Sequence, residues 1–188
     1  MLPFHVPDIG EEEIAEVVDV LRSGWLTTGP KARDFEREFA AMVGANHAVA
    51  VNSCTAALHL SLEAAGIREG DEVLVPTMTF AATAEVVAYF KAKPVLIDCD
   101  EHTFNLNPDR IEQAITKETK AIIPVHFAGQ PCDMDRILSI ADAYHLQVIE
   151  DAAHALPARY HGKMVGSIAK STCFSFYATK NITTGEGG

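Results

Sequence analysis

The sequence lacks the basic character that a nucleic-acid-binding surface requires. Its 188 residues contain 15 Lys and Arg against 26 Asp and Glu, which gives a formal net charge of -11 at pH 7. Proteins bind nucleic acid mainly through clusters of basic side chains on the phosphate backbone, so this balance argues against nucleic acid as a partner. A single phosphorylated small molecule stays compatible with it, because a few backbone N–H groups can hold one phosphate.

Several other familiar signatures are missing. The four cysteines form no CxxC pair and have no histidine or cysteine nearby at a spacing typical of zinc, so we expect no metal site and reduced thiols in a cytoplasmic protein. The N-terminus has no basic segment followed by an apolar one, and no apolar run approaches membrane-spanning length, so no signal peptide or membrane association is expected. Neither GxGxxG nor GxxxxGK[ST] occurs, which excludes two common phosphate-binding fingerprints.

The chain does contain a regular alternation of apolar strands and helices. Two helices are expected first, at 10–23 and 31–44. Strands are then expected at 47–52, 72–76, 94–100, 120–126, 147–151 and 171–178, with helices at 55–66, 83–92, 108–116 and 133–145. This alternation predicts an α/β fold with a mostly parallel sheet covered by helices on both faces. Ligands of such sheets bind beyond the carboxyl ends of the strands.

The residues after two of the expected strands have either a ligand-binding role or an ordinary structural role. Ser53 and Thr55 stand where a helix begins, and its N-terminus would suit a phosphate, although an ordinary N-cap explains the same residues. Phe80 follows the strand at 72–76, where it could stack on the ring of a ligand or pack in the core beneath the next helix.

The last two expected strands lead to an acidic residue and to a lysine. Glu150 and Asp151 end an apolar strand, and a buried carboxylate costs several kcal/mol unless it is paired. Asp151 could instead cap a helix, with His154 as a partly buried histidine whose hydrogen bonds are satisfied. Lys180 lies in a turn rich in Ser, Thr and Gly; such a lysine is usually a surface charge, but this one is expected at the same edge of the sheet as Asp151.

One cofactor, pyridoxal phosphate, needs these groups together. It requires a lysine amine for a Schiff base, a carboxylate at its ring nitrogen, a helix N-terminus with hydroxyls for its phosphate, and a flat sandwich for its ring. These four requirements would be met, in order, by Lys180, Asp151, residues 53–56 with Ser175, and Phe80 against Ala153.

The motifs LTTGP, NSCTAALHLSL, GDEVLVPTMTFAATAE, PVLIDCD, VIEDAAHA and SFYATKNITTGEGG make the chain resemble the DegT/StrS family of sugar aminotransferases. The resemblance covers essentially the whole chain, and the motifs occur in the family's order. It implies the large domain of a fold-type-I pyridoxal phosphate transferase. It also implies a homodimer with a shared active site, which moves an amino group, from glutamate by family analogy, to a keto-sugar nucleotide in the biosynthesis of cell-surface polysaccharide or a related sugar.

The resemblance further implies a role for individual positions. Lys180 matches the Schiff-base lysine, and Asp151 matches the partner of the pyridine nitrogen. The other matches are His154 near the ring hydroxyl of the cofactor, Phe80 and Ala153 on the two ring faces, Cys54 and Thr55 in the phosphate cradle at the helix start, Ser175 as a phosphate-binding hydroxyl, and Thr28 on the substrate side.

The same resemblance implies a longer protein. Family members run to roughly twice this length, so residues 1–188 would comprise an N-terminal segment and most of the large domain, truncated after the Schiff-base lysine and without the small C-terminal domain. In the family, the strand after the lysine returns antiparallel between the first strand and the lysine-bearing strand. We therefore expect either further polypeptide beside 47–52 or a distortion there.

Two alternatives to an aminotransferase stay open from the sequence. Some relatives resemble dehydratases that act on the same substrates, but those replace the lysine with histidine, and Lys180 argues against them. The second alternative is an inactive or partner-dependent relative that binds pyridoxal phosphate without turnover.

Overall fold

The computed structural model describes residues 2–3 and 5–188, which divide into two compact units, one ending at Ala50 and the other spanning Val51–Gly188. The first unit contains α1 (Glu11–Ser23) and α2 (Pro30–Val43), and both helices were predicted from the sequence. Each helix ends at a glycine, Gly24 or Gly44, with a left-handed backbone that a side chain would disfavour.

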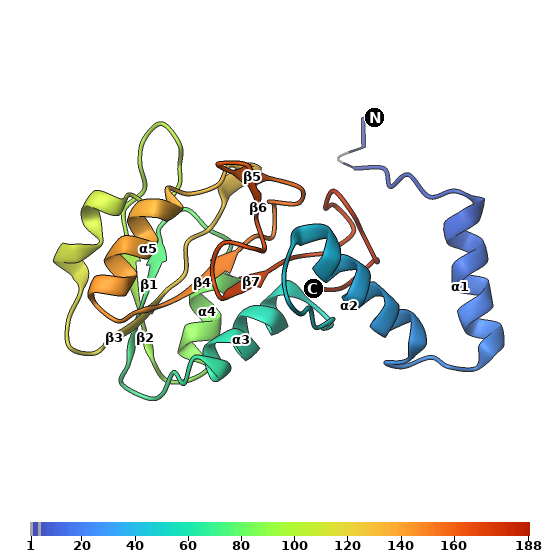
Figure 1. Cartoon of the computed structure of the whole chain (residues 1–188), viewed down its shortest axis with the longest axis horizontal. Coiled ribbons are helices and arrows are strands. Elements are labelled where there is room, and N and C mark those ends of the chain that lie inside the picture. The colour runs from blue at the N-terminus through green and yellow to red at the C-terminus, as the bar shows by residue number, and fades with distance from the viewer. Residues whose placement is uncertain (1, 4) are drawn as a thin grey trace. The chain divides into compact units, whose positions relative to one another are not determined.

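The Val51–Gly188 unit is built on a parallel sheet (Figure 1). In chain order its strands are β1 (Glu72–Pro76), β2 (Lys93–Ile97), β3 (Thr119–Ile122), β4 (Gln147–Asp151), β5 (Arg159–Tyr160), β6 (Lys163–Met164) and β7 (Ser171–Cys173). Five strands of the described residues form one sheet in the order β2-β1-β3-β4-β7, with every neighbouring pair parallel. The predicted α/β fold with a mostly parallel sheet is therefore confirmed.

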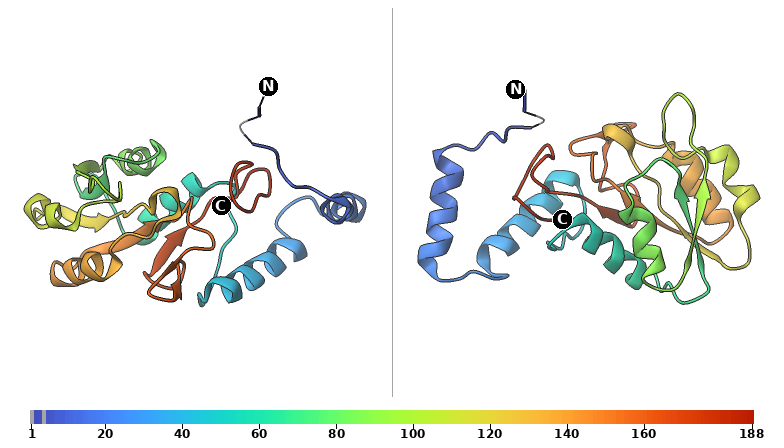
Figure 2. Two further views of the ribbon diagram at one scale, coloured as in Figure 1. Left: turned by 90° about the horizontal axis from the view of Figure 1, so that it is seen from above. Right: turned by 180° about the vertical axis from the view of Figure 1, so that it is seen from behind.

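Helices cover both faces of this sheet. They are α3 (Cys54–Ala64), α4 (Ala82–Ala88) and α5 (Met134–Ala143), and three 3₁₀ turns accompany them, η1 (Pro108–Arg110), η2 (Glu112–Ala114) and η3 (Phe127–Gly129). Figure 2, left, shows α4 and α5 on opposite sides of the strands. The described helices include none that is long and apolar enough to cross a membrane.

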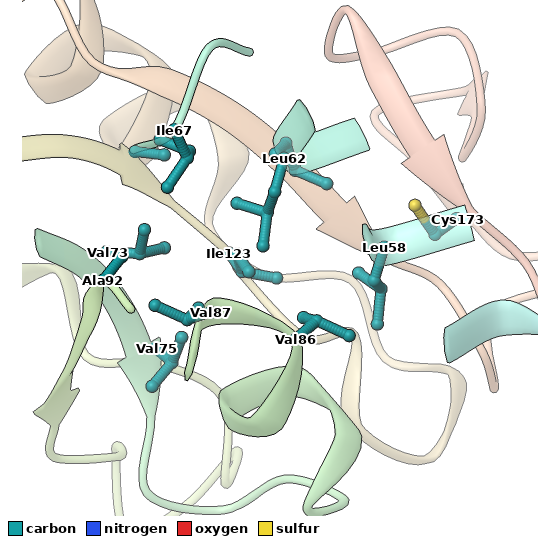
Figure 3. Packing of buried hydrophobic residues seen from close by; sticks show 12 residues of the cluster. Leu58, Leu62, Ile67, Val73, Val75, Val86, Val87, Ala92, Ile123 and Cys173 are labelled. Atoms are coloured by element: carbon teal, nitrogen blue, oxygen red, sulfur yellow. The ribbon is translucent and has the colours of Figure 1, made fainter. Parts of the chain in front are cut away.

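The two-residue period of a strand divides the core into two clusters. Val73 and Val75 of β1 pack with Leu58 and Leu62 of α3 and with residues of α4 (Figure 3). Leu74, between the two valines, packs instead with residues of α5 on the other face. Because both faces of each strand are buried in this way, the strands read as continuous apolar runs in the sequence.

The strand predicted at 47–52 was wrong. Residues 47–50 form no strand, and in the described chain Val51 pairs only with Gly188, each N–H donating to the other residue's carbonyl over 2.9 and 3.0 Å. Reciprocal bonds of this kind are the pattern of an antiparallel pair. An apolar run becomes a strand only where another strand runs alongside it, and here a single residue does so.

Other corrections concern short elements. The α-helix predicted at 108–116 was wrong, because the segment forms the two 3₁₀ turns η1 and η2 and buries only Ile111 completely. Ala114 and Ile115 are only partly buried against the core, and a segment this short then gains too little to offset helix nucleation. The strand predicted at 120–126 ends at Ile122, before Pro124, which has no N–H to donate. The hairpin of β5 and β6 was not predicted.

Candidate active site at the carboxyl ends of the strands

Asp151 is the last residue of β4, and its side chain is held from two directions. The residue is only 5% exposed. Its Oδ2 accepts a hydrogen bond from Thr83 Oγ1 at 2.8 Å, and its Oδ1 accepts one from the backbone N–H of Ala153 at 3.1 Å. Burial raises the pKa of the Asp151 carboxyl, and these two hydrogen bonds act in the opposite direction. In the fully described segment 152–158 no helix begins, so Asp151 is not a helix cap.

Thr83 is a site residue that the sequence analysis missed. It lies on α4 with no exposed surface, and its Oγ1 is 2.7 Å from Thr79 Oγ1 as well as within bonding distance of Asp151. The available signal was the spacing of Thr79 and Thr83, four residues apart in TMTFAAT, with the second on the same helix face as the apolar Val86 and Val87. A buried hydroxyl among apolar residues requires a polar partner, and here the partner is the carboxylate.

Lys180 is half-buried in a turn after β7 that is fixed on both sides. Its N–H donates to the carbonyl of Tyr177 at 2.9 Å. The side-chain amide of Asn181 donates to the carbonyl of Leu156 at 2.7 Å, which ties the turn to the segment that follows Asp151. The loop that carries the lysine is therefore anchored beside the strand that carries the buried carboxylate.

Electrostatic effects place four titratable groups in one neighbourhood. Burial lowers the pKa of His154, the charge of Lys180 lowers it further, and Asp151 acts in the opposite direction. Burial also raises the pKa of the Cys54 thiol far above its ordinary range, with Asp151 adding to the effect and Lys180 opposing it. Because charge effects decay with distance, the predicted residues Asp151, Lys180, His154 and Cys54 lie close together. Cys54 is consequently a neutral thiol and not a nucleophile.

The N-terminus of α3 provides a place for an anion. Ser53 is the N-cap, and its Oγ accepts from the N–H of Ala56 at 3.1 Å. Cys54 and Thr55 follow as the first two helical residues, where backbone N–H groups have no partner within the helix and the helix dipole is positive. Ser53 can therefore cap α3 while the first turn of the helix binds a phosphate, because the cap uses only one N–H.

The glycines after Lys180 allow the chain to approach this helix start. A Cβ on Gly188 would lie 2.3 Å from the carbonyl carbon of Ser53 and 2.4 Å from the backbone nitrogen of Cys54. Only a residue without a side chain fits at this distance from backbone atoms. The glycine-rich turn that begins at the lysine therefore reaches backbone contact with the residues at the start of α3.

The remaining predicted site residues differ in exposure and in hydrogen bonding. Phe80 is 80% exposed, so the reading of Phe80 as a core aromatic was wrong and its ring is open to a ligand. Ala153 and Ser175 are half-buried, and Ser175 Oγ accepts from the N–H of Tyr177 at 3.4 Å. Thr28 belongs to the unit that ends at Ala50, where its carbonyl accepts from the Trp25 indole, and its role on the substrate side stays a prediction.

A second buried carboxylate stands next to Asp151. Glu150 has no exposed surface and points to the opposite face of β4, where His126 Nε2 lies 2.9 Å from its Oε2. Its Oε1 accepts from Thr172 Oγ1 at 2.7 Å and from the N–H of Ala169 at 3.0 Å. All of its hydrogen bonds are made within the protein, which leaves Asp151 as the carboxylate of this strand that is available to a ligand.

Comparison with known proteins agrees with this geometry. The family model described as the DegT/DnrJ/EryC1/StrS aminotransferase family matches residues 7–188. The chain belongs to this family. Among curated relatives, the spore coat polysaccharide biosynthesis protein SpsC of Bacillus subtilis (strain 168) is 57% identical over 187 residues, which are 100% of this chain and 48% of SpsC. The chain thus spans about half the length of the curated family members that it matches.

Solved structures of aminotransferases also match the chain over almost its whole length. The putative sugar aminotransferase Spr1654 from Streptococcus pneumoniae, in its PLP-form, is 45% identical with a TM-score of 0.95, over 100% of this chain and 52% of that one. The same protein in its PMP-form gives the same identity and TM-score. The aminotransferase from Psychrobacter cryohalolentis is 43% identical with a TM-score of 0.95, over 99% of this chain and 48% of that one.

Proposed function

We propose that the protein is a pyridoxal-phosphate-dependent aminotransferase that transfers an amino group, with glutamate as donor, to a keto-sugar nucleotide. The observation that carries the proposal is the buried carboxylate of Asp151 beside the anchored turn of Lys180 and the open N-terminus of α3. The name of SpsC, which refers to spore coat polysaccharide biosynthesis, supports a role in making a cell-surface polysaccharide or a related sugar. We place this activity in the cytoplasm, with neither nucleic acid nor membrane as a partner.

The residues present fit the cofactor, as three features of the site indicate. The buried carboxylate of Asp151 has its desolvation best offset by a cation such as a protonated pyridine. Phe80 follows β1 and is 80% exposed, so its ring face is free to stack on the flat ring of the cofactor. The first turn of α3 would bind the phosphate through its N–H groups, assisted by the hydroxyls of Thr55 and Ser175.

When bound, pyridoxal phosphate supplies an electron sink that stabilises negative charge on the carbon next to the substrate nitrogen. Asp151 would keep the pyridine nitrogen protonated, which that electron sink requires. The amine of Lys180 would hold the cofactor, and as a free amine it would take the proton from the α-carbon of the amino donor. Phe80 and Ala153 would contact the two faces of the ring, and His154 would stand near the ring hydroxyl.

The alternatives make different predictions. A dehydratase of this family would carry histidine in place of Lys180, so the lysine favours the aminotransferase. An inactive or partner-dependent relative would bind the cofactor without turnover, and it is the second candidate. We further propose a homodimer in which the active site is shared between subunits.

The test is an absorbance spectrum of the purified protein with pyridoxal phosphate, recorded before and after glutamate. An aminotransferase should show a visible band that disappears with glutamate and returns with a keto-sugar nucleotide. A band that persists with every amino donor would favour the relative that binds without turnover. Absence of any band in the wild-type protein would contradict the proposed cofactor.

A further inference from the structure

We propose that Thr79 and Thr83 form a hydroxyl relay that holds Asp151 as an oriented carboxylate, which makes Thr83 a positioning residue for the reaction. This inference rests on the proposed function, because the orientation of Asp151 matters for the ring nitrogen of the cofactor. The relay has three members, which lie on two elements and on the loop between β1 and α4: Thr79 in the loop, Thr83 on α4 and Asp151 on β4.

The direction of the relay follows from the chemistry of its members. An ionised carboxylate only accepts hydrogen bonds, so the bond of 2.8 Å between Thr83 Oγ1 and Asp151 Oδ2 uses the hydroxyl proton of Thr83. The oxygen of Thr83 must then accept the bond of 2.7 Å from the hydroxyl of Thr79. Both hydroxyl dipoles therefore point toward the carboxylate, and bonds aligned in this way strengthen one another.

The surroundings of the relay leave it little freedom to reorient. Thr83 has no exposed surface and lies one turn before Val86 and Val87, which belong to the core cluster between α4 and the sheet. Its β-branched side chain has few rotamers in a helix. Since Ala153 holds the other oxygen of Asp151, the two hydrogen bonds together fix the plane of the carboxylate. Each oxygen keeps a lone pair with which it can face the cofactor.

Among the described residues, Thr83 is the side chain that donates a hydrogen bond to the carboxylate of Asp151. The titratable groups around Asp151 are Cys54 from α3, Cys173 from β7, Cys132 before α5, His126 after β3, His154 after β4, and Lys180 in the turn after β7, whose charge acts on the same Cys54 and His154. Burial raises the pKa of both Cys132 and Cys173 to about 12, so these thiols carry no charge near neutral pH. The two histidines stabilise the carboxylate only when they are protonated. Thr83 does so at every pH, against a burial effect that disfavours the charged form.

Three variants separate the relay from simple packing. Thr83→Val keeps the shape of the side chain and removes the hydroxyl, Thr83→Ser returns the hydroxyl, and Thr79→Val removes only the outer donor. The first measurement is the titration of the Asp151 carboxyl by carbon-13 NMR in cofactor-free protein, with Asp151→Asn to assign its signal. The second is the dissociation constant of pyridoxal phosphate as a function of pH.

We expect the Asp151 carboxyl to titrate at higher pH in Thr83→Val than in wild type, at wild-type pH in Thr83→Ser, and between the two in Thr79→Val. A hydrogen bond to a charged group is worth enough to weaken cofactor binding by about tenfold in Thr83→Val. The loss should grow as the pH falls, because the variant protonates Asp151 sooner.

Two results would overturn the relay. One is a Thr83→Val protein in which Asp151 titrates at the wild-type pH. The other is a Thr83→Ser protein as impaired as Thr83→Val, which would assign the effect to packing. If wild-type protein fails to bind pyridoxal phosphate, the proposed function is wrong, yet the NMR titration in cofactor-free protein still decides whether the relay exists. The two failures are therefore distinguishable.

Discussion

Removing the acceptor from the buried pair of Glu150 and His126 should destabilise the protein strongly. Neither side chain has any exposed surface, and Glu150 accepts three hydrogen bonds, from His126, Thr172 and the N–H of Ala169. Breaking a buried pair by removing one partner typically costs about 3–5 kcal/mol, because the other partner is left unpaired. Out of a total stability of about 5–15 kcal/mol, Glu150→Ala is therefore a large perturbation that could prevent folding.

Glu150→Gln is the sharper form of the experiment. His126 Nδ1 accepts from the N–H of Cys132 at 3.1 Å, so His126 carries its proton on Nε2 and donates it to Glu150. A glutamine at 150 can satisfy Thr172 and Ala169 with its oxygen, but its amide then meets the Nε2–H of His126, donor against donor. Moving the proton to Nδ1 creates the same conflict with Cys132. One buried donor stays unpaired in either case, which costs about 1–3 kcal/mol.

The assay is urea unfolding followed by circular dichroism, with Glu101→Gln as the matched control. The side chain of Glu101 is 87% exposed, so this variant should lie within about 0.5 kcal/mol of wild type. We expect Glu150→Gln to unfold at clearly lower urea concentration than both. A Glu150→Gln protein as stable as the control would refute the tautomer argument and the pairing of Glu150 with His126.

Four further substitutions test the proposed site. Lys180→Ala should fold normally and lose the visible band of bound cofactor; a variant that keeps full transaminase activity would exclude Lys180 as the Schiff-base residue. Asp151→Asn should retain the cofactor but turn over far more slowly, because asparagine cannot stabilise a protonated pyridine, and near-normal rates would contradict this. Phe80→Ala should leave stability within about 0.5 kcal/mol of wild type and weaken cofactor binding by roughly 2- to 10-fold; unchanged affinity would argue against stacking. Gly188→Ala should cost about 1–3 kcal/mol and weaken binding of inorganic phosphate, whereas a wild-type melting curve would show that the backbone approach to α3 can relax.

The parts of the fold that the sequence predicted well are those in which local pattern and burial agree. The apolar runs at 72–76 and 147–151 became β1 and β4 with the predicted bounds, because both faces of these strands are covered. The segment 47–52 is also apolar, but in the described chain Val51 alone forms a ladder pair, with Gly188, and strand formation depends on a neighbour that no local pattern specifies. The segment 108–116 has helix-forming residues, but of its apolar residues only Ile111 is fully buried, and this burial is too small to stabilise an α-helix.

The candidate site shows the same division. Parallel strands bring their carboxyl ends to one edge, so the sequence could place Asp151 and the segment after β7 at the same edge, although β7 ends at Cys173, short of the predicted bound, and no strand precedes α3 in the described chain. It could not reveal that Phe80 is exposed, because an aromatic after a strand is equally compatible with the core. It also missed Thr83, because a threonine in a helix has many ordinary explanations until its partner is seen.

The pair Glu150 and Asp151 illustrates why adjacent identical charges can have different roles. Successive residues of a strand point to opposite faces, so one carboxylate enters the α5 side of the sheet and the other the α4 side. On the first side, His126, Thr172 and Ala169 use the hydrogen-bonding capacity of Glu150 within the protein. On the second side, the carboxylate of Asp151 accepts hydrogen bonds from Thr83 and Ala153 in the described chain, and Lys180 and the start of α3 lie near it. The carboxylate of Glu150 is fully hydrogen-bonded within the protein and serves the fold. The carboxylate of Asp151 keeps free lone pairs near an anchored lysine and can bind a cation. The register of β4 therefore assigns Asp151 to the site, and a shift by one residue would exchange the two roles.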